Sequence, residues 1–157
     1  MLCRVSGKDI MVSVIYNFVK DELYWAVKGG GAWLNNNQIH VSDRSLERSF
    51  VEISTDFKTE DGRKLFMSAT ESVKTVTRFN CSCFTSCMIA SGRIEGRIVT
   101  YGKGGPWDYA PGALLISEAG GVVEHFGGEH YDYTKTNTFV AGTKTIVEFA
   151  RRLTQDA

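Results

Sequence analysis

The residue in this sequence best placed to do chemistry is Asp108, an acid at the entrance of an apolar segment. A carboxylate at a helix N-terminus accepts hydrogen bonds from the free N–H groups of the first turn, so Asp108 is expected to cap a helix. A carboxylate is also a ligand that a hard divalent cation prefers, and the free N–H groups beside it can hold a phosphate. The two interpretations are compatible, because one oxygen can cap the helix while the other faces a cation.

The segment Gly104–Val123 must position that acid. The pattern predicts a helix from Asp108, with Pro111 in the first turn, where no N–H needs an internal partner. Gly120 and Gly121 are expected to end it. Apolar residues lie on almost every side of this predicted helix, so we expect it to be buried on most sides. They are Ala110, Ala113, Leu114, Leu115, Ile116 and Ala119.

The run PWDYAPG at Pro106–Gly112, followed by EAGG at Glu118–Gly121, resembles a known signature. It is similar to the W-D-x-A-A-G, helix, E-A-G-G pattern of the inositol monophosphatase superfamily, whose members are magnesium-dependent phosphatases. In that family the Asp after Trp binds metal, so the resemblance implies that Asp108 is a ligand of Mg²⁺. Pro111 stands where the family usually has Ala, which implies a shifted helix start.

A second stretch carries the same resemblance in the expected order. The segments Ile15–Asn17, Asp21–Tyr24, Gly31–Asn35 and Ile39–Ser42 are similar to the family's VYNP, DELF, G-x-GA-x-LNG and I-x-VS. The triplet Gly29–Gly31 lacks the Lys-Ser/Thr ending of a P-loop. We therefore interpret it as a conformationally permissive break between two strands and not as a phosphate-binding loop.

The resemblance also implies a substrate pocket. In relatives an R-x-G-[ST]-A-A segment lines it, and here Arg78–Cys83, RFNCSC, takes that place. Substrate-binding roles are therefore expected for Asn80, Cys81 and Ser82.

Relatives often carry a substrate-binding Glu a few residues before the W-D pair. Here Ile98–Pro106 contains no Glu, and Tyr101, beside Thr100, is the expected substrate-binding residue instead. Three nearby cations could meet a more acidic substrate or remain solvated surface charge, the interpretation that we favour. They are Arg93, Arg97 and Lys103.

The family's N-terminal motifs are missing from this chain. Relatives supply a metal-binding Glu and a D-P-[IL]-D-G-T motif there, and this sequence has neither. We therefore expect one inositol monophosphatase-like domain over residues 1–157 that is N-terminally incomplete.

The resemblance implies hydrolysis of a small phosphate ester by metal-activated water, without a covalent intermediate. It also implies a homodimer, or pairing with a chain that supplies the missing half. The absence of that half is expected to leave a sheet face and a strand edge uncovered, which favours pairing with another chain. The alternative is a non-catalytic, shortened relative that acts as an interaction module or a folded remnant.

Composition excludes several other classes. The 157 residues balance 18 basic against 18 acidic side chains, which argues against a nucleic-acid partner. No apolar run is long enough to span a membrane, and the start lacks the core of a signal peptide. We therefore expect a cytoplasmic protein with reduced thiols. Cys81, Cys83 and Cys87 form no C-x-x-C pair, so we interpret them as structural thiols and not as a zinc site.

The remaining segments alternate between strand and helix patterns. Strands are expected at Lys8–Phe18, Glu22–Val27, Ala32–Leu34, Gln38–Val41, Ser49–Ser54, Val73–Phe79, Arg97–Tyr101, Val122–Phe126 and Thr138–Ala141. Helices are expected at Thr59–Thr70, Cys81–Ser91 and around Ile146–Leu153. This order predicts an α/β protein, a layered α+β sandwich, matching the C-terminal part of the αβαβα fold that the resemblance implies.

Overall fold

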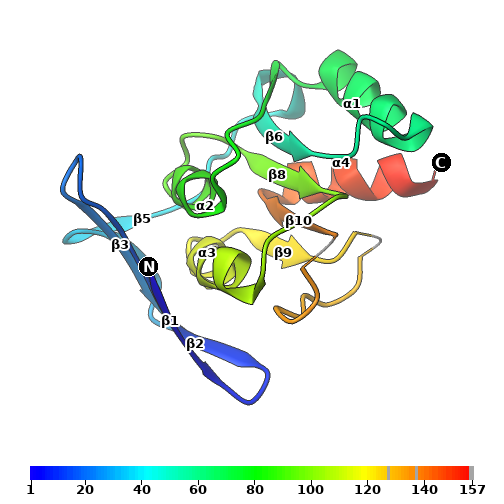
Figure 1. Cartoon of the computed structure of the whole chain (residues 1–157). Coiled ribbons are helices and arrows are strands. Elements are labelled where there is room, and N and C mark those ends of the chain that lie inside the picture. The colour runs from blue at the N-terminus through cyan, green and yellow to red at the C-terminus, as the bar shows by residue number, and fades with distance from the viewer. Residues whose placement is uncertain (127, 137, 156–157) are drawn as a thin grey trace.

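The computed structural model describes residues 1–126, 128–136 and 138–155, which form two five-stranded sheets and four α-helices (Figure 1). The first sheet is an antiparallel meander in chain order. Its strands are β1 (Leu2–Ser6), β2 (Asp9–Asn17), β3 (Glu22–Val27), β4 (Ala32–Leu34) and β5 (Asn37–Ile39).

The second sheet has the strand order β7-β6-β8-β10-β9. Its strands are β6 (Phe50–Ser54), β7 (Thr75–Thr77), β8 (Gly96–Val99), β9 (Val122–Glu124) and β10 (Phe139–Gly142). Strand β6 pairs in parallel with both β7 and β8, while β10 runs antiparallel to β8 and β9. The carboxyl ends of β7, β6 and β8 therefore meet at one edge.

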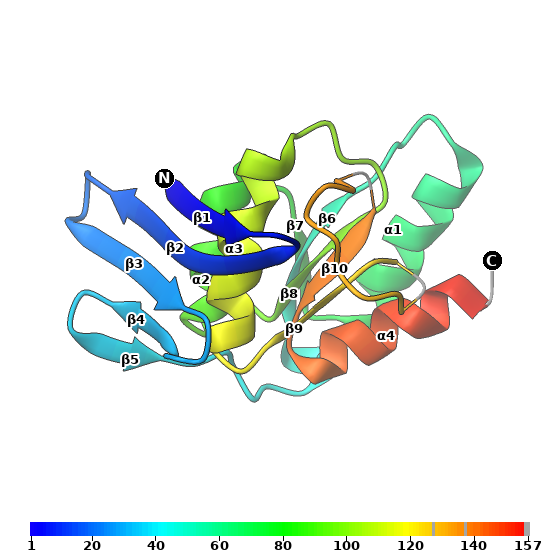
Figure 2. The same cartoon turned by 90° about the horizontal axis from the view of Figure 1, so that it is seen from below.

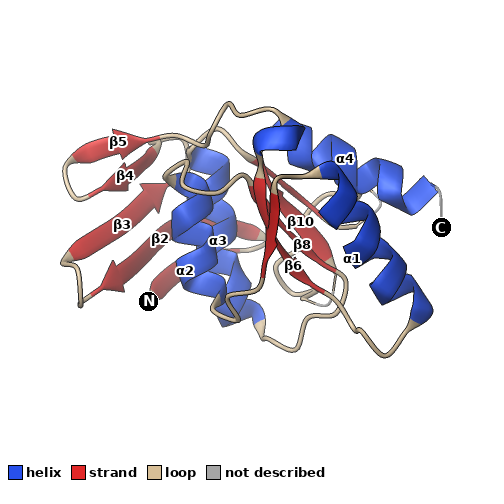
Figure 3. Ribbon diagram, turned by 90° about the horizontal axis from the view of Figure 1, so that it is seen from above, coloured by secondary structure: helices blue, strands red, loops and turns tan. Residues whose placement is uncertain are grey.

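The elements stack in four alternating layers (Figure 3). Helices α2 (Ser82–Ala90) and α3 (Pro106–Glu118) lie between the two sheets. Helices α1 (Glu60–Ser72) and α4 (Lys144–Gln155) cover the far face of the second sheet, and the first sheet is an outer layer (Figure 2). A short 3₁₀ helix, Leu46–Arg48, lies on the connection between the sheets. The predicted layered α+β class is confirmed.

One apolar cluster lies on each side of the second sheet. One joins the first sheet to α2 and α3 and includes the fully buried Ile89 and Leu115. The other lies under α1 and α4 and includes Ile53 and Ile146. Helix α3 is buried on most sides, as its composition predicts.

The start of α3 differs from the sequence-based expectation. The helix begins at Pro106 with Gly105 as N-cap, so Asp108 is its third residue. The prediction that Pro111 lies in the first turn was wrong, because Pro106 already occupies the first helical position, where proline is favoured. Pro111 lies inside the helix, and its carbonyl accepts a hydrogen bond from the hydroxyl of Ser13 on β2 at 2.7 Å.

Several strands also differ from the sequence-based expectation, and β1 and β7 differ most. Strand β1 was not expected at all, and it forms by pairing with β2 across a register shift between Arg4 and Val5. The predicted strand Val73–Phe79 shrinks to the three residues of β7, because Val73 caps the end of α1. Among the helices that the structure describes, none combines the length and the apolar character needed to cross a membrane.

Candidate functional site

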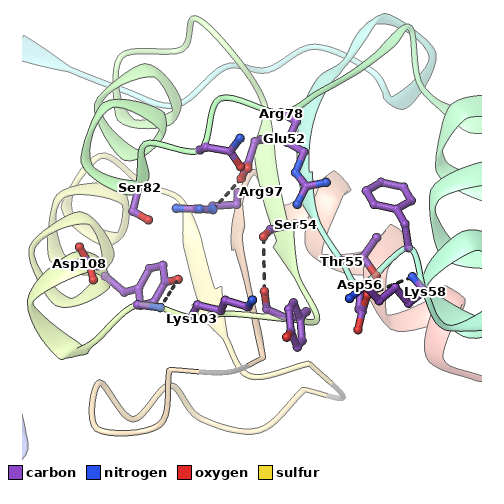
Figure 4. A pocket seen from close by; sticks show the side chains of 15 residues that line it. Glu52, Ser54, Thr55, Asp56, Lys58, Arg78, Ser82, Arg97, Lys103 and Asp108 are labelled. Carbon is purple, nitrogen blue, oxygen red and sulfur yellow. Dashed lines mark hydrogen bonds and ion pairs between the residues drawn. The ribbon is translucent and has the colours of Figure 1, made fainter.

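A pocket of about 520 Å³ opens where the parallel strands β6, β7 and β8 end (Figure 4). Crevices at the carboxyl ends of parallel strands are the usual ligand sites of such sheets, because the following loops diverge there. The lining residues are Glu52, Ser54, Thr55, Asp56, Phe57, Lys58, Arg78, Asn80, Ser82, Arg97, Tyr101, Lys103, Gly104, Asp108 and Tyr109.

The starts of two helices, α2 and α3, also lie at the pocket. Ser82 is the first residue of α2, Gly104 directly precedes the N-cap of α3, and Asp108 lies in the first turn of α3. Both helices point free N–H groups and the positive ends of their dipoles toward this region, which favours an anion. Asn80, just before α2, has φ +54°, a left-handed conformation that Asn tolerates better than most residues.

Asp108 combines a structural contact with exposure to the pocket. Its Oδ2 accepts a hydrogen bond from the N–H of Gly105 at 2.9 Å, so the acid does help to cap α3, although from the third helical position. The hydroxyl of Tyr109 accepts from the N–H of Gly104 at 3.3 Å and fixes the approach to the helix. Asp108 is half-buried and lines the pocket.

A buried ion pair forms the floor of the pocket. The Nε of Arg97 lies 2.7 Å from Oε2 of Glu52, and the two residues are only 4% and 1% exposed. The guanidinium also lies near the rings of Tyr109 and Phe139, at 5.5 and 5.8 Å from their centroids. Burial raises the pKa of Glu52, and the charges of Arg97 and Arg78 partly oppose this shift.

The interpretation of Arg97 as solvated surface charge was therefore wrong. The residue lies on β8, where every side chain is buried, and its partner comes from the neighbouring strand β6. A signal was present in the sequence, since Glu52 and Arg97 are each flanked by residues of a strand pattern. What the sequence could not show is that the two strands are adjacent.

The structure brings four of the five predicted site residues to this pocket. Asn80, Ser82, Tyr101 and Asp108 all line it. Cys81 does not belong to the lining and is an exposed residue at the N-cap of α2. Their roles in binding remain predictions. Sequence reasoning missed the loop after β6, Thr55–Lys58, which forms another wall.

The fit of a metal ion can be judged from the carboxylates. The described residues contain no group of three or more His, Cys, Asp or Glu side chains that could hold a metal. Of the acids in the pocket, Glu52 is bound to Arg97, while Asp56 accepts from the N–H of Lys58. Among the described residues, Asp56 and Asp108 are therefore the pocket carboxylates without a cationic partner, and two carboxylates alone do not supply the six oxygens of an octahedral magnesium site.

Three other acids of the C-terminal half make contacts outside the pocket. Glu118, at the far end of α3, accepts from the N–H groups of Gly29 and Gly31 at 2.8 and 2.9 Å. Glu124 pairs with Arg151. Asp132 accepts from Thr134.

A pocket with cations, two helix starts and a carboxylate at the carboxyl ends of parallel strands defines an α/β protein with an anion-binding site. The chain belongs to the inositol monophosphatase family, whose sequence model matches residues 1–156.

Curated relatives and solved structures agree with this assignment. Inositol monophosphatase 1 of Solanum lycopersicum is 34% identical over 134 residues, covering 82% of this chain and 49% of the relative. Nus factor SuhB of Escherichia coli K12 is 29% identical over 150 residues, covering 92% and 55%. The inositol monophosphatase structure from Anabaena superposes with a TM-score of 0.82 at 27% identity, covering 94% and 60%. The chain spans about half the length of the curated relatives it matches.

Proposed function

We propose that this chain is the substrate-binding portion of a magnesium-dependent phosphomonoester hydrolase. The observation that carries the proposal is the position of Asp108, which lines the pocket at the start of α3. The run around it resembles the metal-binding motif of the family to which the chain belongs. The names of two relatives, inositol monophosphatase 1 and inositol-1-monophosphatase, support a small phosphate ester as substrate.

The chain's own residues would bind and orient the ester. Free N–H groups at the starts of α2 and α3, together with Arg97 and Lys103, favour the negative charge of a phosphate. Asn80, Ser82 and Tyr101 offer hydrogen-bonding groups to the rest of the substrate. Asp108 would supply one carboxylate to magnesium, an ion that commonly binds one or two carboxylates together with substrate phosphate oxygens.

Catalysis would take further carboxylates from outside the described residues, because these contain no group of three or more acids that could hold the metal. A segment or a partner chain that completes the pocket would supply them, and a homodimer or a complex with such a chain is therefore part of the proposal. A cytoplasmic location is also proposed, because all four cysteines are free thiols, as is usual in a reducing compartment.

A non-catalytic role is the second candidate function. The incomplete set of carboxylates favours it, and several relatives are called Nus factor SuhB. In that case the pocket would be retained for binding or as part of a stable fold, and partners would bind elsewhere on the chain.

The test is a titration of inorganic phosphate and phosphate esters into the purified chain by calorimetry, with and without Mg²⁺. We expect Mg²⁺ to tighten binding to the wild-type chain about ten-fold and to have no such effect on Asp108→Asn. Asp61→Asn, an exposed acid in the first turn of α1, is the matched control and should behave as the wild type.

Release of phosphate is measured on the same samples. Turnover that requires Mg²⁺ and Asp108 would show that the chain completes its site, for example across an interface. A magnesium effect that survives in Asp108→Asn would refute the role of this residue. Absence of both binding and turnover in folded protein would leave the non-catalytic candidate.

A further inference from the structure

The pocket has more cations than a single phosphate group requires. Lys58, Arg78, Arg97 and Lys103 line it, against three carboxylates. Glu52 is committed to Arg97. Among the residues that the structure describes, Lys58, Arg78 and Lys103 have no carboxylate within ion-pair distance.

These cations are distributed along the pocket and not gathered at one point (Figure 4). Asp108 and Ser82 lie at one side, Arg78 and Lys58 lie at the other, and Arg97 and Lys103 lie between them. The pocket, at about 520 Å³, is much larger than a phosphate group. The pocket can therefore hold a ligand that carries a second anionic group besides its phosphate.

Arg97 is fixed in a way that suits anion binding. Its Nε faces Glu52, and its Nη1 is sealed from solvent without a hydrogen-bond partner among the described residues. The residue lines the pocket, so its guanidinium can present a donor to a ligand there. Because the ion pair and the two flanking rings hold the guanidinium, an anion meets an ordered donor there.

Arg78 is held at the far side by stacking. Its guanidinium lies 5.1 Å from the ring centroid of Phe57, which in turn packs edge-on against Phe66 at 5.1 Å. The side chain is exposed and its charge is not neutralised by a described carboxylate. A neutral polyol would leave this charge in water, whereas a carboxylate or second phosphate would form a charge-assisted hydrogen bond.

Building on the proposed function, we propose that the pocket selects phosphate esters that carry a second anionic group. The ester phosphate binds at the side of Asp108 and Ser82. The second anion binds Arg78 and Lys58, with Arg97 and Lys103 lining the space between. The pocket thus discriminates by charge at the end of the substrate remote from the ester.

The test compares ligands that differ in one group. The affinity of 3-phosphoglycerate is measured against that of glycerol 3-phosphate, and 6-phosphogluconate against glucose 6-phosphate, by calorimetry at low salt with Mg²⁺ present. We expect the acidic member of at least one pair to bind about ten-fold tighter, because electrostatic complementarity favours it. In Arg78→Gln this ratio should fall to about two or less.

The matched control is Lys20→Gln, which removes an exposed cation from the turn between β2 and β3, outside the pocket, and should keep the ratio at ten. Equal affinities within both pairs for the wild-type chain would overturn the inference and leave the proposed function standing. A ratio of ten that persists in Arg78→Gln would overturn it as well. Binding of none of the four esters and no inorganic phosphate would overturn the inference together with the proposed function.

Discussion

At the scale of single residues, the ion pair between Glu52 and Arg97 sets the stability of the pocket floor. Both side chains are almost fully buried, so removing one partner leaves an uncompensated charge in the protein. We expect Glu52→Gln to lower the free energy of unfolding by about 3 kcal/mol. Urea denaturation followed by circular dichroism measures this loss.

The control is the double variant Glu52→Met with Arg97→Met, which removes both charges and keeps apolar volume. Its free energy of unfolding should stay within about 1 kcal/mol of the wild type. If the single and double variants unfold at the same urea concentration, the ion pair is not what makes Glu52→Gln costly.

A second ionic contact joins the first sheet to the loop before β8 and makes a prediction about pH. Glu22 accepts from Arg93 at 2.9 Å, from the hydroxyl of Tyr24 at 3.1 Å and from Asn17 at 3.2 Å. The hydrogen bond from Arg93 is the main reason why the pKa of Glu22 is lowered below its ordinary value of 4.5. Burial raises the pKa of Tyr24 to about 12, so its hydroxyl remains a neutral donor.

A carboxyl group whose pKa is lowered by folding stabilises the native state above its unfolded pKa and loses that contribution as the pH falls through its folded value. Glu22 should therefore contribute about 1 kcal/mol near neutral pH, lost below about pH 4.5. Thermal unfolding of Glu22→Gln from pH 7 to 3 should show a shallower acid decline than the wild type. Glu71→Gln, an exposed control, should retain the wild-type slope.

At the scale of elements, the sequence predicted the helices and strands whose own residues show a strong hydrophobic pattern. Strand β3 matches its predicted bounds Glu22–Val27, because this run of aromatic and aliphatic residues is bounded by turn residues on both sides. The buried body of α3 was equally clear from its apolar residues. The acid of the candidate site, Asp108, could be found because its motif is contiguous.

What the sequence could not predict depends on distant partners. Strand β1 is mostly exposed and has no clear alternation, so it exists only through its ladder with β2. The burial of Arg97 depends on Glu52, 45 residues earlier in the chain. The start of α3 was misplaced because Pro106 and Pro111 both suit a first turn, so local sequence alone does not decide between them.

Gly112 controls how closely α2 and α3 approach each other. We expect Ala at this position to be less stable than Gly, although Ala is normally the better helix former. A Cβ at this position would lie 2.1 Å from the Oγ and 2.5 Å from the Cβ of Ser86 on α2. Helix propensity alone favours Ala over Gly by about 1 kcal/mol. We expect Gly112→Ala instead to destabilise the chain by about 2 kcal/mol, because the helices must separate. Chemical denaturation measures the difference.

A substitution on α2 should relieve the clash that Gly112→Ala creates with Ser86. Ser86→Gly removes both atoms that the new Cβ would meet, so combining it with Gly112→Ala should recover part of the lost stability. A strictly additive loss in the double variant would show that the clash with Ser86 is not the cause.

At the scale of the whole molecule, the layers leave one apolar face without a cover. In β2 and β3 the side chains that alternate away from α3 are paired across the strands, as Val12 with Val27, Val14 with Trp25, and Tyr16 with Leu23. Trp25 stacks on Trp33 of β4 with centroids 5.5 Å apart. Leu2, Tyr16, Leu23 and Val27 are between 37% and 60% exposed. Figure 3 shows no described element beyond this face.

An apolar sheet face of this kind drives association in water, since burying it against a second copy removes it from solvent. We therefore predict that the purified chain self-associates as its concentration rises, measured by sedimentation velocity. Leu23→Lys with Val27→Lys places two charges on the face and should shift the chain to monomer.

The matched control for the charges is Phe18→Lys with Val19→Lys, in the turn between β2 and β3, where both side chains are at least 77% exposed. It adds the same charge outside the strands and should leave association unchanged, because the apolar face stays intact. A wild-type chain that is monomeric at all concentrations would contradict the prediction. Equal dissociation by both double variants would show that net charge, and not this face, controls assembly.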